Sequence, residues 1–127
     1  MEMPIRLRFS YLAKYRMATS PTYQYSAKVH KIIDADTVDF LVDLGLNTLR
    51  VIRCRLYGIN APERFTDEGK AATTYLRETL GEGKVILLTY KDPTDKYGRW
   101  IADVYVVGKS VSSMMVESGH AIRKDYT

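Results

Sequence analysis

Three successive runs of alternating apolar and polar residues constrain the fold of this chain more than any other feature of its sequence. The runs cover residues 23–29, 38–44 and 49–57. A two-residue period places successive side chains on opposite faces of a β-strand. The runs therefore predict three consecutive strands, and Gly45 and Asn47 predict a turn between the second and the third.

An amphipathic helix is predicted after the third strand. The intervening residues 58–65 contain a proline and are expected to be irregular. Thr66 is a favourable N-cap residue, and Gly81 is a favourable end. Between them, apolar residues recur at helical spacing: Ala72, Tyr75, Leu76 and Leu80.

Two further strands and a short helix complete the pattern. The strands are predicted at residues 84–90 and 99–107, with a polar turn at residues 92–98, and the helix runs from Ser110 to Gly119. The order is therefore three strands, a helix, two strands and a helix. This order predicts an α+β fold that is mainly β, a five-stranded OB-fold barrel with two helices.

The composition is that of a single domain. A chain of 127 residues that is 46% hydrophobic can bury one ordinary core. Residues 1–22 lack clean periodicity, so we interpret them as a basic N-terminal arm and residues 23–127 as the domain. The single cysteine, Cys54, excludes an internal disulfide and is interpreted as a small core residue.

Basic residues are concentrated near the N-terminus. The net charge is +4, but residues 1–31 hold six lysines and arginines against one glutamate, and the remainder is nearly neutral. A basic arm of this kind suits a polyanionic partner such as nucleic acid. It is equally consistent with a solvated tail that aids solubility.

No hydrophobic segment predicts a leader or a membrane span. Basic residues interrupt every apolar stretch of residues 1–17, and no segment reaches the ~20 apolar residues of a membrane helix. We therefore expect no membrane association. The expected location is cytoplasmic for the sequence as it stands, and secreted if a leader has been removed.

Polar residues at the ends of predicted strands include the groups that a phosphodiesterase needs. Asp36, Asn60 and Glu63 offer side-chain oxygens to a hard divalent cation. Arg55 and Arg99 can stabilise charge on a phosphoryl transition state, because a guanidinium stays protonated and fits phosphate oxygens. Taken singly, each residue has a simpler interpretation, since aspartates form turns and strand arginines often face solvent.

In combination these residues form recognisable motifs. The segments 33–38, 55–63 and 95–99 resemble, in order and spacing, the three signature segments of the staphylococcal-nuclease family. Residues 108–111 and 117–121 also resemble the family's final segments, so the similarity covers about residues 23–123.

The resemblance implies an OB-fold enzyme with one bound calcium ion. Such an enzyme hydrolyses DNA and RNA, prefers single-stranded or locally open substrate, and leaves 3′-phosphate ends. The implied metal ligands are Asp36, Asn60, the backbone carbonyl of Ala61, and Glu63. The family resemblance also favours a monomer.

The resemblance further implies catalytic and nucleotide-binding roles. Arg55 and Arg99 match the arginines that hold the scissile phosphate, and Glu63 matches the residue that positions or activates water. Asp34 matches a carboxylate beside the metal ligands. Lys96 and Tyr97 match positions beside the terminal phosphate of the nucleotide. With Glu63 in place, His30 and His120 are interpreted as ordinary surface or barrel-edge residues.

Two departures from the family pattern affect these expectations. Asn60 stands where the family usually has aspartate, so the site loses one negative charge and calcium should bind more weakly. The chain ends at Thr127, and the family's C-terminal pocket tyrosines are not cleanly matched. Two alternatives therefore stay open: a catalytically weak or inactive nucleic-acid-binding module, and a plain OB-fold adaptor recruited through the arm.

Overall fold

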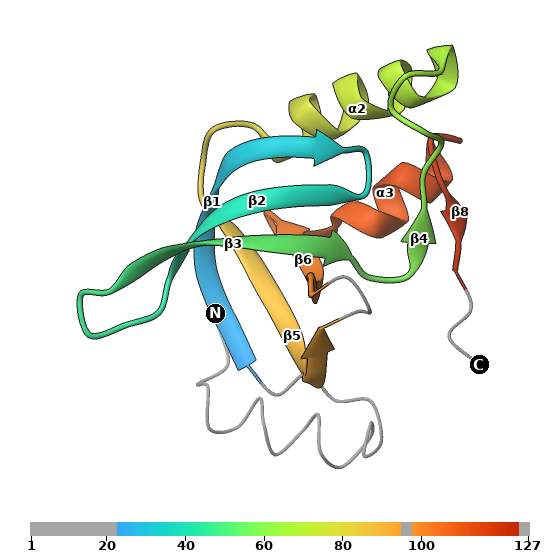
Figure 1. Ribbon diagram of the computed structural model, residues 1–127. Coiled ribbons are helices and arrows are strands. Elements are labelled where there is room, and N and C mark those ends of the chain that lie inside the picture. Colours follow the sequence, from blue (N-terminus) through green and yellow to red (C-terminus); the bar gives the residue numbers. More distant parts are fainter. Residues whose placement is uncertain (1–22, 95–97, 125–127) are drawn as a thin grey trace.

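The fold is known from a computed structural model that describes residues 23–94 and 98–124 (Figure 1). The predicted arm at residues 1–22 lies outside the described residues, as do Lys96 and Tyr97.

Five strands form a closed barrel. β1 (Tyr23–Asp34), β2 (Thr37–Asp43) and β3 (Leu49–Leu56) are consecutive antiparallel strands. β5 (Val85–Thr94) pairs antiparallel with β1 and with β6 (Trp100–Val106). A short parallel pairing of β3 with β6 closes the ring (Figure 1). The expected OB-fold-like, mainly β architecture is confirmed.

Two helices cover the barrel, with the predicted caps. α2 (Asp67–Leu80) begins after Thr66, whose hydroxyl accepts the Gly69 N–H at 3.0 Å, and ends at Gly81. α3 (Val111–Glu117) begins after Ser110, whose hydroxyl accepts the Ser113 N–H at 3.3 Å. Side-chain oxygens at these positions satisfy N–H groups that have no partner within the helix.

The inward residues of all five strands meet the apolar faces of both helices in one core. β2 contributes the largest buried side chain, Phe40, and α3 contributes Met115, both fully buried. The other core residues include Val38, Val42, Cys54, Leu56, Ala72, Leu76, Val85, Leu87, Ala102, Val104 and Val111. Burial of this apolar surface is the main favourable contribution to folding.

Two expectations about the connecting segments need correction. Residues 58–65 were expected to be irregular, but β4 (Ile59–Asn60) pairs with β8 (Ile122–Arg123). β5 continues to Thr94, into the predicted polar turn. A further short strand, β7 (Lys109–Ser110), pairs with β6 ahead of α3. The β4–β8 pairing fixes the chain that leads from β3 to α2, which matters for the site.

Candidate active site

The turn between β1 and β2 is anchored to the end of β3. Ala35 is fully buried in this turn, between Asp34 and Asp36. The Leu56 N–H donates to the Asp36 carbonyl at 2.8 Å, outside the regular strand ladder. The backbone at Asp36 is thereby fixed beside β3, and its carboxylate lies next to Arg55 at 3.3 Å.

Arg55 is a buried cation that contacts two of the predicted metal ligands. Its Nη2 donates to Asn60 Oδ1 at 2.6 Å, and its Nη1 lies 3.3 Å from Asp36 Oδ2. The residue is only 7% exposed. A guanidinium this deeply buried requires such partners, because an unpaired buried charge is costly. Asp36 and Asn60 therefore hold Arg55 in a fixed position at the end of β3.

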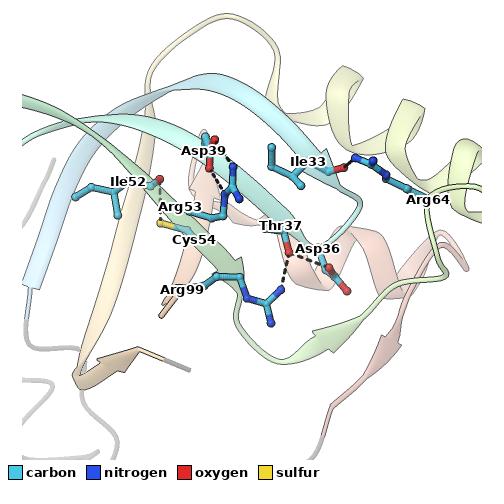
Figure 2. A network of polar contacts seen from close by, with 9 residues as sticks. All are labelled: Ile33, Asp36, Thr37, Asp39, Ile52, Arg53, Cys54, Arg64 and Arg99. Carbon is cyan, nitrogen blue, oxygen red and sulfur yellow. Dashed lines mark hydrogen bonds and ion pairs between the residues drawn. The ribbon is translucent and has the colours of Figure 1, made fainter. Parts of the chain in front are cut away.

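Asp36 is also the centre of a wider hydrogen-bond network. The Ala61 N–H donates to Asp36 Oδ2 at 3.0 Å, and the Thr37 hydroxyl donates to Asp36 Oδ1 at 3.2 Å. Arg99 Nη1 in turn donates to the Thr37 hydroxyl at 3.2 Å (Figure 2). Thr37 thus links the second arginine to the carboxylate that holds the first. Thr37 stands in the first signature segment, but the sequence assigned its side chain no role, since a threonine at the start of a strand carries no functional signal of its own.

Asp36, Arg55, Ala61 and Arg99 line an open cleft of about 440 Å³. The side chain of Glu63 is exposed at its edge. The Glu63 carbonyl accepts the hydroxyl of Thr66 at 2.7 Å and its N–H at 3.1 Å, which fixes this segment to the start of α2. The cleft is lined by Asp34, Asp36, Arg55, Ala61, Pro62, Glu63, Arg64, Phe65 and Arg99.

Carboxylates crowd one another in this cleft. The pKa of Asp34 is raised above 3.8, first by burial and then by the negative charge of Asp36, with a smaller contribution from Glu63. The positive charges of Arg64 and Arg99 offset part of this rise. A cationic ligand would therefore bind favourably in this cleft, because it would stabilise the ionised form of these carboxylates.

The donor set suits a hard cation in chemical type, because Asp36, Asn60, Glu63 and the Ala61 carbonyl all offer oxygen. The described part of the chain holds no group of three or more His, Cys, Asp or Glu side chains arranged around a metal position. Arg55 contacts both Asp36 and Asn60. A metal ion would therefore share or compete for the oxygens that Arg55 now uses.

The structure brings most of the sequence-predicted site residues together. Asp34, Asp36, Arg55, Ala61, Glu63 and Arg99 all line the main cleft. Asn60 reaches Arg55 but lines a smaller neighbouring cleft of about 250 Å³, together with His120. Arg64 and Phe65 also line the main cleft but were not predicted. The roles predicted for Lys96 and Tyr97 concern residues outside the described part of the chain.

Other chemically reactive side chains lie away from the main cleft. Burial raises the pKa of the Cys54 thiol to about 12, which makes a thiolate nucleophile untenable at neutral pH. His30 is exposed on β1. His120 packs against Tyr75, with ring centroids 4.8 Å apart. Neither histidine lines the main cleft.

Curated relatives of this chain include proteins named as nucleases. An "Uncharacterized endonuclease" of Escherichia coli O157:H7 is 33% identical over 95 residues, which cover 74% of this chain and 58% of that protein. The "Thermonuclease" of Staphylococcus intermedius is 31% identical over 104 residues, covering 77% and 59%. "Protein ParB" of Escherichia coli is 32% identical over 115 residues, covering 83% and 61%. The chain thus spans about three fifths of the length of these relatives.

None of the helices in the described part of the chain is long and apolar enough to cross a membrane.

The profile of the family described as "Staphylococcal nuclease homologue" matches residues 53–127, more than half of the sequence. This segment contains Arg55, Glu63 and Arg99, which line the main cleft, and Asn60, which accepts a hydrogen bond from Arg55. The chain therefore belongs to the staphylococcal nuclease homologue family.

Proposed function

We propose that this protein is a metal-dependent nuclease that hydrolyses phosphodiester bonds in DNA and RNA. The observation that carries the proposal is the convergence of Arg55 and Arg99 with Asp36 and Glu63 on one open cleft. Two cations beside carboxylates suit a dianionic phosphoryl transition state and an activated water. Family membership and the names of the relatives support the same activity.

In this mechanism the scissile phosphate lies between Arg55 and Arg99. Both guanidinium groups donate to its non-bridging oxygens, and these contacts strengthen as charge develops in the transition state. Glu63 accepts a proton from the attacking water. The new P–O bond forms as the bond to the 5′-oxygen breaks, and the leaving oxygen takes up a proton from solvent, so the products carry a 3′-phosphate and a 5′-hydroxyl. Single-stranded or locally open substrate is preferred because its backbone can enter the cleft.

We further propose one calcium ion as the cofactor, held by Asp36, Asn60, the Ala61 carbonyl and Glu63. When bound, it would polarise the phosphate and the attacking water. Asp34 lies in the same cleft and adds negative charge near these ligands. Since Asn60 replaces a carboxylate with an amide, the calcium requirement should be high. Lys96 and Tyr97 are proposed to contact the terminal phosphate of the nucleotide, and the active form is proposed to be a monomer.

The test is release of acid-soluble nucleotides from heat-denatured DNA across a calcium series, with magnesium, manganese and chelator arms. Metal-dependent release that chelator abolishes is the expected result. Arg55→Ala and Arg99→Ala should each lower the rate by about 10²–10³. Arg50→Ala, at an exposed position on β3, is the matched control and should retain activity. An Arg55 or Arg99 variant that is folded and turns over normally would remove that arginine from the mechanism.

The second candidate is a nucleic-acid-binding module without catalysis. It is favoured by the contacts of Arg55, because Asp36 and Asn60 already neutralise and hydrogen-bond that arginine without a metal. A folded protein that binds single-stranded DNA but releases no nucleotides with any of the three metals would establish this alternative.

A further inference from the structure

A second groove, separate from the active-site cleft, lies between β1 and the end of α2. Its volume is about 400 Å³. We call it the basic groove, and it is lined by Lys28, Val29, His30, Lys31, Ile32, Arg77, Gly81 and Glu82.

A β-bulge in β1 produces the basic face of this groove. Val29 pairs with Phe40 and Lys31 pairs with Asp39, so that His30 has no partner across the ladder. An extra residue of this kind breaks the two-residue alternation and re-aims the side chains that follow. Lys28 is exposed through the ordinary alternation, and the bulge leaves both His30 and Lys31 exposed, while Val29 and Ile32 pack against the core.

The cations of the basic groove are not neutralised by neighbouring carboxylates. Lys28, Lys31 and Arg77 are set against one acidic lining residue, Glu82. None of these three cations takes part in an ion pair among the described residues. Asp39, which feels the charge of Lys31, is already bonded to Arg53 at 2.7 Å. Three cations against one carboxylate leave the lining of the groove with an excess of positive charge, which attracts an anion with several charged groups.

The groove and the active-site cleft lie on one path along β1. α2 packs against β1 and runs in the opposite direction beside it (Figure 1). At one end of this path Arg64 donates to the Ile33 carbonyl at 3.2 Å, next to Asp34 of the cleft. At the other end Arg77 of α2 meets Lys28 and Lys31 in the basic groove. His30 and Asp34 are separated by about 13 Å at the usual rise of a strand.

We propose that the basic groove is a second binding site for the phosphates of a single polynucleotide strand, a few nucleotides away from the bond that is cut. The proposal rests on the proposed nuclease function and deepens it. Lysine and arginine contacts to backbone phosphates are independent of base sequence, so the groove would add affinity for long substrates without selecting a sequence.

The experiment compares two matched double variants of the full chain. Lys31→Gln with Arg77→Gln removes one lysine and one arginine from the groove. Arg50→Gln with Lys109→Gln removes the same charges from exposed positions on β3 and β7. Binding of single-stranded oligonucleotides of about 4 and about 16 nucleotides, spanning the site sizes of OB folds, is measured by fluorescence anisotropy. Every buffer of the salt series contains chelator, which removes the metal that cleavage is proposed to need.

For the long oligonucleotide, the logarithm of the association constant falls as the logarithm of the salt concentration rises. The groove variant should make this slope shallower by about 1.4, since each of the two lost phosphate contacts contributes about 0.7. The control variant should leave that slope near the wild-type value, and the short oligonucleotide should bind all three proteins alike. In a cleavage assay the groove variant should raise KM for the long substrate and leave turnover of a dinucleotide unchanged.

Equal slope changes in both double variants would overturn the proposal, because the effect would then be one of net charge. An unchanged slope in a folded groove variant, or equal wild-type affinity for both lengths, would overturn it as well. The proposed nuclease function would be contradicted by a different result, namely that the wild-type protein releases no nucleotides. Binding is measured without metal, so the two failures are distinguishable.

Discussion

At the scale of single residues, the contact between Arg55 and Asn60 is the most informative feature of the site. The buried guanidinium is held by one carboxylate, Asp36, and one amide oxygen. The charges of Arg55 and Asp36 offset each other, so the amide of Asn60 adds no negative charge for a metal ion to that of Glu63 and Asp34. An aspartate at position 60 would supply that charge and would still accept the hydrogen bond from Arg55.

Asn60→Asp is therefore expected to tighten the binding of calcium. The added charge lies where Asn60 Oδ1 now accepts from Arg55, beside the Asp36 carboxylate. Isothermal titration with calcium should show a lower Kd, and the calcium needed for half-maximal nucleotide release should fall. Asn47→Asp, at an exposed position in the turn between β2 and β3, is a control for a general gain of negative charge. An unchanged Kd would mean that residue 60 does not face the ion.

Asp34 and Asp39 should respond to pH in opposite directions. The pKa of Asp34 is raised by burial and by Asp36, so its ionised form destabilises the folded state at neutral pH. That cost disappears as the pH falls through the raised pKa. The pKa of Asp39 is lowered by its hydrogen bond from Arg53, so its contribution is stabilising at neutral pH and is lost in acid.

Asp34→Asn should consequently raise the Tm at pH 7, and Asp39→Asn should lower it. Both differences from wild type should shrink as the pH is brought below 3.8, the ordinary value for an aspartate. The Asp39 effect should stay at about 1 kcal/mol or less, because Arg53 is half exposed and solvent screens the pair. Thermal melts of the two variants at several pH values check the signs. A destabilised Asp34→Asn protein at pH 7 would contradict the crowding of carboxylates in the cleft.

The residue types of the site could be predicted from the sequence, but their contacts could not. Motif spacing indicates Asp36, Arg55, Glu63 and Arg99, because each stands in a recognisable segment. The bond from Arg55 to Asn60 depends on how β4 approaches the end of β3, which no local pattern encodes. The same holds for the position of Thr37 between Arg99 and Asp36. The roles of Lys96 and Tyr97 stay predictions.

At the scale of elements, local chemistry explains which predictions were confirmed. Thr66 and Ser110 begin their helices as expected, because capping involves only a few neighbouring residues. The β4–β8 pairing was missed because a strand of two residues has no period to detect. Arg55 alternates away from Cys54 on β3 yet is buried as well, because Asp36, Asn60 and Ala61 gather over that end of the strand.

Gly69 shows how tightly the start of α2 packs on the segment that carries Glu63. A Cβ at position 69 would lie 1.7 Å from the Glu63 carbonyl oxygen and 2.9 Å from the Arg64 Cα. Helix propensity alone would favour alanine over glycine by about 1 kcal/mol. The clash involves backbone atoms that no side-chain rotation can relieve, so steric repulsion should outweigh propensity.

Gly69→Ala is therefore expected to lower the free energy of unfolding by about 1–3 kcal/mol, the usual cost of overpacking. The displaced segment should also shift Glu63 and reduce nucleotide release. Gly83→Ala is the matched control, because a Cβ at position 83 would meet nothing within 4 Å. Denaturant unfolding and activity assays of both variants provide the measurements. Equal stability of the two variants would show that the helix start can move without cost.

At the scale of the whole molecule, the seam that closes the barrel is also the foundation of the site. β3 and β6 pair only through Cys54–Leu56 and Trp100–Ala102. Arg55 lies within this seam and Arg99 directly precedes it. β3 also pairs with β2 from Leu49 to Arg55, and the turn that joins these two strands projects from the barrel, with Leu46 fully exposed (Figure 1). The pairing that closes the barrel therefore also sets the spacing of the two arginines.

Core substitutions at the seam and away from it should accordingly differ in their effect on activity. Leu56→Ala and Leu87→Ala both remove a leucine that is at most 1% exposed, and each should lower the free energy of unfolding by about 2–5 kcal/mol. The Leu56 side chain packs beneath the seam next to Arg55, whereas Leu87 lies on β5. At a temperature where both variants are fully folded, Leu56→Ala should release nucleotides more slowly than Leu87→Ala. Equal rates would mean that the two arginines keep their spacing even when the packing beneath the seam is loosened.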